Sequence, residues 1–381
     1  MRVLFFTHEK AYGGASRALI TLIDELLKHN YEIYVVVPFK NAKIVDELKL
    51  RNVKIISSFY GWWQYPTNLS FVMKTLWKII YRFNFISYFR LVRKIKKLNI
   101  DVIHTNTSVI DIGCKVAKKL NIPHVWHFRE FTSIHLKFII NSSKAYKFIN
   151  DNGGQLIFIS KAVSNFYKEN IKNKNCHIVY DGIPKEYYYK KEYQEHKTVN
   201  FLLVGTLEEN KGQMLAIEAC KKLKDENINN FTLTFIGNDP TNYSEKLISK
   251  AKEYKLDSKV KYKGFTKNVL NARKKYDVEL MCSPKEAFGL VTVEAMFSGN
   301  PVIGSNSGAT PEIIEDGTNG YLYRLNDSND LKNKMKKFIT KPNLIKKLGL
   351  NAQKIATNKF SSKNYYDSII EIYNNVRKWF K

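Results

Sequence analysis

Short apolar runs of strand type alternate with amphipathic helical patterns along the whole chain. Such alternation predicts parallel β-sheets that are covered by helices on both faces. A first series of strands is expected near residues 2–6, 32–37, 53–57, 101–105, 123–127, 155–159 and 176–180. A second series is expected near residues 199–204, 231–236, 259–263, 277–281, 301–303 and 320–323. The sequence therefore predicts an α/β chain with two doubly wound, Rossmann-like domains.

A chain of 381 residues is too long for one comfortable hydrophobic core, which also favours two domains. Residues 184–197 lack an alternating apolar pattern and are dense in charge and tyrosine, as is typical of a linker. We expect an N-terminal domain at 1–184, a linker at 185–198, a C-terminal domain at 199–360 and a C-terminal helix at 361–381. Ligands of doubly wound domains bind at the carboxyl ends of the strands, so we expect the domains to face a central cleft.

The charge of the chain is strongly unbalanced, with 62 basic and 35 acidic residues and a net charge of +27. Such a balance implies an anionic partner or surface. The excess is uneven, because the segment from Lys49 to Asn99 contains eleven Lys or Arg residues and no Asp or Glu. Nucleic acid is not favoured as the partner, since the sequence has no zinc-finger spacing, no RNP-type aromatic motif and no bZIP heptads.

Within the basic segment, Lys74, Lys78 and Arg82 recur at a spacing of four. Apolar residues occupy another side of the same expected helix, at Val72, Leu76, Ile79 and Phe83. Aromatic residues suited to the headgroup level of an anionic membrane surround it, at Trp62, Trp63, Trp77, Tyr81 and Tyr88. We therefore expect the three basic residues to bind a membrane surface. The alternative is that the apolar side packs on the domain core and the basic side is simply solvated.

The termini and the cysteines indicate a cytoplasmic protein. The apolar run at residues 1–6 is too short for a secretory signal, and no apolar stretch reaches the roughly 18 residues that cross a bilayer. Four scattered cysteines form neither a metal pattern nor a disulfide framework, so we expect reduced, buried thiols. Together with the basic helix, this predicts a protein that is peripheral on the inner face of the cell membrane.

Two carboxylates flank a glycine-led helix start in the run from Glu286 to Glu294. Gly289 can bring its backbone close to a ligand, and the amides of Leu290 and Val291 are expected to lack acceptors at the positive end of the helix dipole. A phosphate suits that position. The carboxylate of Glu294, one turn further on, can accept hydrogen bonds from two adjacent ribose hydroxyls, while Glu286 would face a sugar. The alternative is a surface acid beside an ordinary helix.

Two further strand ends carry glycine or lysine. Gly13 and Gly14 follow the first strand, where bare backbone amides can reach a phosphate or a bound acceptor. A plain turn is the alternative, and the pattern is not the dinucleotide G-x-G-x-x-G. Lys211 follows the strand at 199–204, where its ammonium can neutralise a leaving diphosphate.

A third strand end, at residues 125–130, carries His127, Arg129 and Glu130. A lone histidine is more often structural than catalytic. Arg129 and Glu130 could form a local ion pair or could hold the hydroxyl of an acceptor.

The run from Tyr276 to Ile314, with the Gly-Gly turn and the histidine segment, resembles the retaining GT-B glycosyltransferases of family 4, the glycosyl transferases of group 1. Within that family, the chain resembles the members that make cell-envelope or capsular polysaccharides. The resemblance implies the GT-B architecture, a hexosyltransferase-type activity, and a last helix that crosses back to the N-terminal domain. It implies no metal and no cofactor, with a nucleotide-diphosphate sugar as co-substrate.

The resemblance also implies roles for individual residues. Glu294 would hold the ribose, Glu286 the sugar hydroxyls, and Lys211 the diphosphate. His127 would lie against the sugar near the anomeric carbon, so the catalytic candidates are His127, Glu286 and Lys211. The acceptor-binding candidates are Arg129 and Glu130. The donor-binding candidates are Gly13, Gly14, Thr206, Lys211, Phe288, Gly289, Leu290, Val291 and Glu294.

The implied reaction is a metal-independent, front-face transfer to a glycan or a polyprenyl-diphosphate-linked saccharide. One departure bears on the donor site, because Thr206 stands where many relatives carry an arginine. Lys211 and the helix amides would have to suffice, or another basic residue such as Arg17 would compensate. Another departure is Asp181 and Pro184 in a turn where relatives commonly show Asn and Asp. The alternatives are a nucleotide-sugar epimerase and a non-catalytic membrane-binding module on the same fold.

Overall fold

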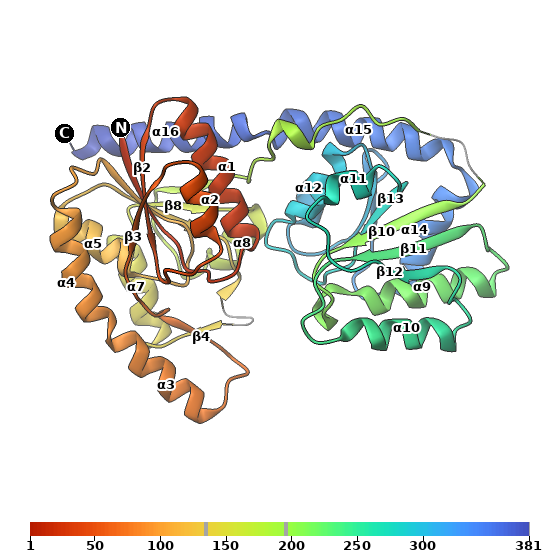
Figure 1. The fold of residues 1–381 in the computed structure, drawn as a ribbon, viewed down its shortest axis with the longest axis horizontal. Helices are drawn as coiled ribbons and strands as arrows, with labels where there is room; N and C mark the ends of the chain where they lie inside the picture. The colour runs from red at the N-terminus through yellow and green to blue at the C-terminus, as the bar shows by residue number, and fades with distance from the viewer. Residues whose placement is uncertain (133–135, 194–196, 381) are drawn as a thin grey trace. The chain divides into compact units, whose positions relative to one another are not determined.

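The computed structural model describes residues 1–132, 136–193 and 197–380. The chain divides into two compact units (Figure 1). Unit 1 comprises Met1–Gly182 and Ser362–Lys381, and unit 2 comprises Ile183–Ser361. The expected linker at 185–198 belongs to unit 2, and its residues 194–196 lie outside the described residues.

Unit 1 is built on a parallel sheet of seven strands in the order β3-β2-β1-β5-β6-β8-β9. The strands are β1 (Arg2–Phe6), β2 (Glu32–Val37), β3 (Lys54–Ser57), β5 (Val102–Thr105), β6 (His124–Phe128), β8 (Gln155–Phe158) and β9 (Cys176–Ile178). A separate antiparallel pair joins β4 (Gln64–Pro66) to β7 (Leu136–Phe138). The sequence did not predict this pair, because three-residue strands are too short to show a period.

Helices cover both faces of this sheet. They are α1 (Gly14–Lys28), α2 (Ile44–Leu50), α3 (Phe71–Arg82), α4 (Asn84–Ile95), α5 (Ile112–Leu120), α7 (Ser142–Asn152), α8 (Lys161–Tyr167) and α16 (Ser362–Phe380). Alternate residues of β1 divide between two cores: Val3 and Phe5 pack with α1, α2 and α16, and Leu4 and Phe6 pack with α4 and α5. A strand buried on both sides explains why β1 reads as a continuous apolar run.

Unit 2 repeats the arrangement with six parallel strands in the order β12-β11-β10-β13-β14-β15. The strands are β10 (Val199–Val204), β11 (Phe231–Ile236), β12 (Val260–Tyr262), β13 (Val278–Met281), β14 (Val302–Ser305) and β15 (Gly320–Tyr323). The helices are η1 (Lys185–Tyr187), η2 (Glu209–Lys211), α9 (Gln213–Asp225), α10 (Tyr243–Glu253), α11 (Val269–Arg273), α12 (Leu290–Phe297), α13 (Thr310–Ile313), α14 (Ser328–Thr340) and α15 (Asn343–Lys359). The two sheets confirm the expectation of two doubly wound α/β domains.

Helix α16 belongs to unit 1, although 179 residues of unit 2 precede it in the chain. Its buried residues Tyr365, Ile369 and Tyr373 join the same core as Val3 and Phe5. The hydroxyl of Tyr373 lies 2.7 Å from Nδ1 of the buried His104 on β5. This helix therefore completes the core on one face of the unit 1 sheet.

The cysteines are free, but one of them is not buried. Cys114, Cys220 and Cys282 are buried, whereas Cys176 is exposed. The expectation of four buried thiols is therefore wrong for Cys176, because β9 is an edge strand with little cover. Among the described residues, no helix is long and apolar enough to span a membrane.

Replacing Tyr373 by alanine tests the role of α16. We expect Tyr373→Ala to lower the free energy of unfolding by about 3 to 5 kcal/mol, because it leaves a cavity in the core and removes the partner of His104. Urea unfolding measures the change. Asn374→Ala, at an exposed position of the same helix, is the control and should change it by less than about 0.5 kcal/mol. Equal losses in both variants would contradict the role.

Candidate functional site

In unit 2, the start of α12 presents backbone donors as the sequence predicted. Gly289 is the N-cap of α12 and has φ of 105°, in the left-handed region that favours glycine. Within the described ranges, the amides of Leu290 and Val291 have no acceptor, since the first bonds to Gly289 come from Thr292 and Val293. These amides can receive an anion.

Lys211 and Glu286 lie next to the loop that leads into α12. Lys211 Nζ is 3.0 Å from Glu286 Oε1, and both side chains are partly exposed. Burial raises the pKa of Glu286, but the charge of Lys211 and hydrogen bonds outweigh it, so the pKa lies below its ordinary value. Glu286 is therefore ionised at neutral pH. The structure thus pairs Lys211 with Glu286, two residues for which separate roles were expected.

Close backbone contacts fix this pair in place. A Cβ on Gly212, which follows Lys211 directly, would lie 2.2 Å from the carbonyl oxygen of Cys282, just after β13. The amide of Ala309, after β14, donates to the carbonyl of Glu286 at 2.9 Å. The loops that follow β10, β13 and β14 thus meet at Glu286, at the carboxyl ends of the strands.

Glu294 is buried in an ion-pair cluster that the sequence did not predict. Arg273, with no exposed surface, donates to Glu294 Oε2 at 2.9 Å and to both carboxylate oxygens of Glu279. Burial raises the pKa of Glu279, and the charge of Arg273 opposes the shift. Glu279 lies inside the apolar strand β13, and a buried glutamate requires a buried cation. This glutamate was the sign in the sequence that such an ion pair exists.

Two other donor-binding candidates of unit 2 take part in packing and turn contacts. The side chain of Phe288 is buried against Phe360, with ring centroids 5.8 Å apart, so only its backbone can contact a donor. The carbonyl of Thr206 accepts a hydrogen bond from Gln213 Nε2 at 2.9 Å.

In unit 1, an acidic side chain already occupies the glycine turn. Glu9 Oε2 accepts hydrogen bonds from the amide and the hydroxyl of Ser16, in the first turn of α1. A Cβ on Gly13 would lie 2.9 Å from Glu9 Oε1, so this carboxylate lies directly against the glycine turn. Glu9 thus takes the Ser16 amide, and the expectation that the backbone at Gly13 and Gly14 receives an anion or an acceptor stays a prediction.

Arg129 does not pair with the carboxylate of Glu130, contrary to one expectation from the sequence. Its Nη1 lies 2.8 Å from both carboxylate oxygens of Asp181, its Nε donates to Asn106 and its Nη2 donates to Tyr365. Arg129 is buried, and these partners use its donors. Its expected contact with an acceptor stays a prediction.

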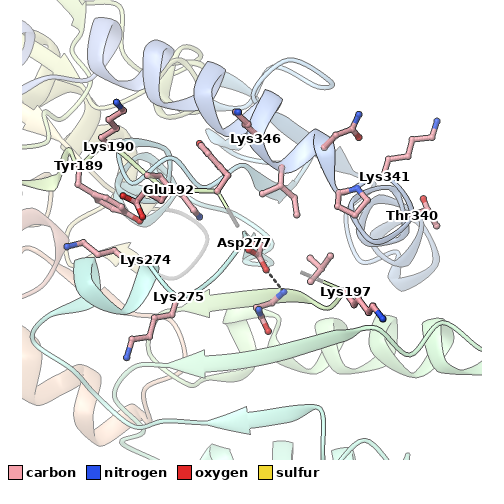
Figure 2. Close-up of a pocket in the computed structure, with 17 residues that line it drawn as sticks. Tyr189, Lys190, Glu192, Lys197, Lys274, Lys275, Asp277, Thr340, Lys341 and Lys346 are labelled. Carbon is pink, nitrogen blue, oxygen red and sulfur yellow. Dashed lines mark hydrogen bonds between the residues drawn. The ribbon is translucent and has the colours of Figure 1, made fainter. Parts of the chain in front are cut away.

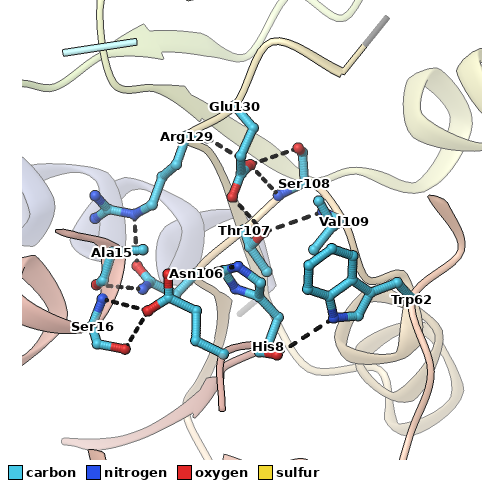
Figure 3. Close-up of polar contacts among 11 residues, drawn as sticks. His8, Ala15, Ser16, Trp62, Asn106, Thr107, Ser108, Val109, Arg129 and Glu130 are labelled. Atoms are coloured by element: carbon cyan, nitrogen blue, oxygen red, sulfur yellow. Dashed lines mark hydrogen bonds and ion pairs between the residues drawn. The ribbon is translucent and has the colours of Figure 1, made fainter. Parts of the chain in front are cut away.

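Glu130 lies in a cluster of polar groups at the carboxyl ends of β5 and β6 (Figure 3). Its carboxylate accepts from the hydroxyls of Thr107 and Ser108 at 2.7 Å each, and from the Ser108 amide at 3.1 Å. Glu130 remains partly exposed. It is therefore held in one orientation yet stays accessible.

His127 is completely buried beneath α16. Its Nδ1 lies 3.3 Å from Arg129 Nη2, and its ring centroid is 5.6 Å from that of His104. Burial, with the nearby Arg129 and His104, holds its pKa well below the ordinary value, so the ring is neutral. The ring of His127 has no exposed surface in this structure, and its expected contact with a donor sugar stays a prediction.

The basic helix expected around residue 78 is α3. Its apolar side does not pack on the core, because none of its residues, all of which the structure describes, is buried. That alternative is therefore wrong. Of the aromatic residues expected at the headgroup level, Trp63 is buried and stacks on Trp126, so that expectation is wrong for Trp63. Trp77 is partly exposed and donates to the carbonyl of Gln64. Lys78 and Arg82 are exposed and Lys74 is partly exposed.

Figure 2 shows the residues around a cavity of about 1290 Å³ in unit 2, and neither Lys211 nor Glu286 is among those that line it. Its lining includes Val199, Asn200 and Asp277, which stand at the amino ends of β10 and β13. It is rich in lysine, but it lies at the opposite strand ends from the candidate site. Among the described residues, no group of three or more His, Cys, Asp or Glu could hold a metal ion.

Two family models match consecutive parts of the chain. The model described as Glycosyltransferase Family 4 matches residues 12–187, and the model described as Glycosyl transferases group 1 matches residues 185–355. Together they span nearly the whole chain.

Individual relatives are similar over most of the chain. N-acetyl-alpha-D-glucosaminyl L-malate synthase of Bacillus anthracis is 22% identical over 96% of this chain and 94% of its own. The capsular polysaccharide biosynthesis glycosyltransferase CapH of Staphylococcus aureus is 28% identical over 59% of this chain and 65% of its own. The crystal structure of Anabaena Alr3699/HepE in complex with UDP has a TM-score of 0.81 and 19% identity, covering 98% of this chain and 100% of the other.

Three buried histidines of unit 1 predict acid sensitivity. Burial lowers the pKa of His104, His124 and His127, with that of His124 at about 4. Unfolded histidine binds a proton below about pH 6.5, whereas these folded rings do not, so stability is full above that pH and falls as the pH falls.

Between about pH 6.5 and 4 we expect the free energy of unfolding to drop by about 1.4 kcal/mol per pH unit for each such histidine. Urea unfolding at a series of pH values measures the slope. His29→Gln, at an exposed position, is the control and should leave the slope unchanged. A flat profile over this range would contradict the buried, neutral state.

Proposed function

Because this chain belongs to the glycosyltransferases of group 1, we propose that it moves a sugar from a nucleotide-diphosphate sugar to a glycan or lipid-linked saccharide, with retention at the anomeric carbon. The observation that carries this proposal is the Lys211–Glu286 ion pair beside the amides that open α12. A cation, an ionised carboxylate and bare amide donors are the groups that a sugar diphosphate requires.

The diphosphate of the donor competes with Glu286 for Lys211. In the proposed complex the Lys211 ammonium turns to the diphosphate, and the amides of Leu290 and Val291 donate to its oxygens. Negative charge grows on the leaving diphosphate in the transition state, so donors aimed at it accelerate the chemical step. Glu294, already oriented by Arg273, holds the ribose hydroxyls. The binding of UDP and of UDP-glucose by the HepE structures supports a nucleotide-sugar donor.

The reaction proceeds on one face of the sugar. The bond between the anomeric carbon and the phosphate oxygen breaks, and the acceptor oxygen forms its bond on the same face. A leaving phosphate oxygen takes the proton of the acceptor hydroxyl, so no protein nucleophile is needed. The ionised Glu286, freed from Lys211, accepts from sugar hydroxyls and lies near the positive charge that develops on the ring.

Cell-envelope polysaccharide assembly is the setting that we propose, with the protein in the cytoplasm. The relative CapH is named for capsular polysaccharide biosynthesis, which supports this setting. A polyprenyl-diphosphate-linked acceptor suits a chain with a net charge of +27. On the acceptor side we retain Glu130, which is held in place and partly exposed.

Removing the Lys211 ammonium should slow turnover strongly. We expect Lys211→Ala to reduce kcat by about 100- to 1000-fold, because it removes a charge that acts mainly in the transition state. The assay follows nucleoside diphosphate released from uridine, guanosine and thymidine diphosphate sugars in the presence of a membrane lipid extract. Lys252→Ala, at an exposed position of α10, is the matched control. Equal losses of melting temperature and activity in Lys211→Ala would overturn the role.

Chelation tests the metal-independent mechanism. We expect full activity in excess EDTA, because Lys211 and the α12 amides supply the positive potential that a divalent ion would otherwise provide. The measurement is the initial rate before and after chelation. Loss of activity that added Mg²⁺ or Mn²⁺ restores would contradict this part of the proposal.

A further inference from the structure

The outer face of α3 is apolar and exposed. Val72, Leu76, Ile79 and Phe83 recur at spacings of four, three and four, which places them on one side of the helix. All four are exposed, Val72 to 74%. Phe71, at the first position of the helix, is 84% exposed. Large apolar side chains gathered in this way mark a surface that is covered by something else.

The opposite side of α3 is fastened to unit 1. Trp77 Nε1 donates to the carbonyl of Gln64 at 2.8 Å, and the hydroxyl of Tyr81 donates to Asp111 at 2.6 Å. Directly after the helix, the side-chain amide of Asn84 exchanges two hydrogen bonds with the backbone of Gly61. The helix cannot roll to bury its apolar face without breaking these bonds. Figure 1 shows α3 extending away from the sheet of its unit.

The apolar surface continues into α4. Phe85, Ile86 and Phe89 are exposed, and the rings of Phe85 and Phe89 pack edge to face at 4.7 Å. Further along the same helix Arg90 and Arg93 are exposed. We call the exposed apolar residues of this region the α3–α4 face; they are Phe71, Val72, Met73, Leu76, Ile79, Phe83, Phe85, Ile86 and Phe89.

The charged side chains of the segment that carries the α3–α4 face have one sign, and the nearby carboxylate of Asp111 is buried and paired with Lys115. The segment from Lys49 to Asn99 contains eleven basic residues and no acidic residue. A cavity of about 620 Å³ beside the face brings Arg82, Lys118 and Lys119 together with Phe85 and Tyr88. A second copy of this chain, itself strongly basic, is a poor electrostatic match for such a surface. In an anionic leaflet the headgroups match the basic side chains and the acyl chains match the apolar side chains.

We propose that the α3–α4 face inserts into the headgroup and upper acyl region of an anionic phospholipid leaflet, with Lys74, Lys78 and Arg82 contacting the lipid phosphates. The apolar side chains enter the leaflet, and the basic side chains remain at the level of the headgroups. This inference does not depend on the proposed sugar transfer, because it concerns a surface apart from Lys211 and Glu286. It gives the membrane contact expected from the sequence a different geometry, in which phenylalanine and aliphatic side chains insert and Trp63 does not.

The test is sedimentation of the full chain with vesicles of phosphatidylglycerol and phosphatidylcholine, without donor or acceptor. We expect binding to vesicles that contain phosphatidylglycerol and weak binding to pure phosphatidylcholine. Charge reversal of Lys74, Lys78 and Arg82 to Glu should reduce the partition coefficient by roughly 100-fold or more, given the contribution of each basic residue near an anionic surface. A matched reversal elsewhere, at the exposed Lys252, Lys267 and Lys354, should have a much smaller effect.

A second variant separates insertion from charge attraction. Leu76→Asp combined with Ile79→Asp should reduce binding at least tenfold, and part of the wild-type binding should persist in 0.5 M NaCl, because salt screens charge but not apolar burial. Leu350→Asp, at an exposed leucine of unit 2, is the control and should bind as the wild type does. All substituted positions are exposed or partly exposed, so the variants should keep the circular dichroism spectrum and the melting temperature.

Unchanged vesicle binding in both α3 variants would overturn the proposal. So would a concentration-dependent dimer that the Leu76→Asp, Ile79→Asp variant abolishes, because a second copy would then cover the face. Release of nucleoside diphosphate from the donor sugars, in the presence of the membrane lipid extract, is measured in parallel. A chain that binds vesicles but turns over no donor would leave this inference standing and would contradict the proposed transfer.

Discussion

The buried guanidinium of Arg129 is the interaction on which the functional end of unit 1 depends. A charge taken out of water costs several kcal/mol unless hydrogen bonds and an opposite charge replace the solvent. Arg129 obtains both, from Asp181 after β9, Asn106 after β5 and Tyr365 on α16. One side chain thus joins three separate segments to the end of β6. Glu130, the next residue, owes its position at the strand ends to this arrangement.

Unit 2 meets the same requirement with Arg273, which forms ion pairs with both Glu279 and Glu294. Glu294 therefore pairs with Arg273 in the folded protein and, in the proposed function, also binds the ribose of the donor. A carboxylate held by a buried guanidinium cannot rotate freely, so the hydroxyls of a bound ribose meet an acceptor already in place. The Lys211–Glu286 pair is different, because it is partly exposed and its partners can separate when a diphosphate arrives.

The sequence predicted the strands and the α12 start well, because both depend on local patterns. The apolar run of β1 and the glycine at position 289 each carry their signal within a few residues. The contacts that the sequence did not predict lie where distant segments meet. Nothing near His127 shows that α16, more than 230 residues later, covers it, and nothing near Arg129 indicates Asp181 as its partner. The exposed face of α3 was ambiguous for the same reason, since an amphipathic pattern shows that a helix has an apolar side but not what lies against it.

The place of α16 in the fold sets an order of events during synthesis. Unit 2 is one continuous segment, Ile183–Ser361, and can fold as soon as it has left the ribosome. Unit 1 is translated first, but one face of its sheet lacks Tyr365, Ile369 and Tyr373 until α16 emerges. The domain that is made first is therefore completed last, and through most of translation it carries an apolar face that only α16 can cover.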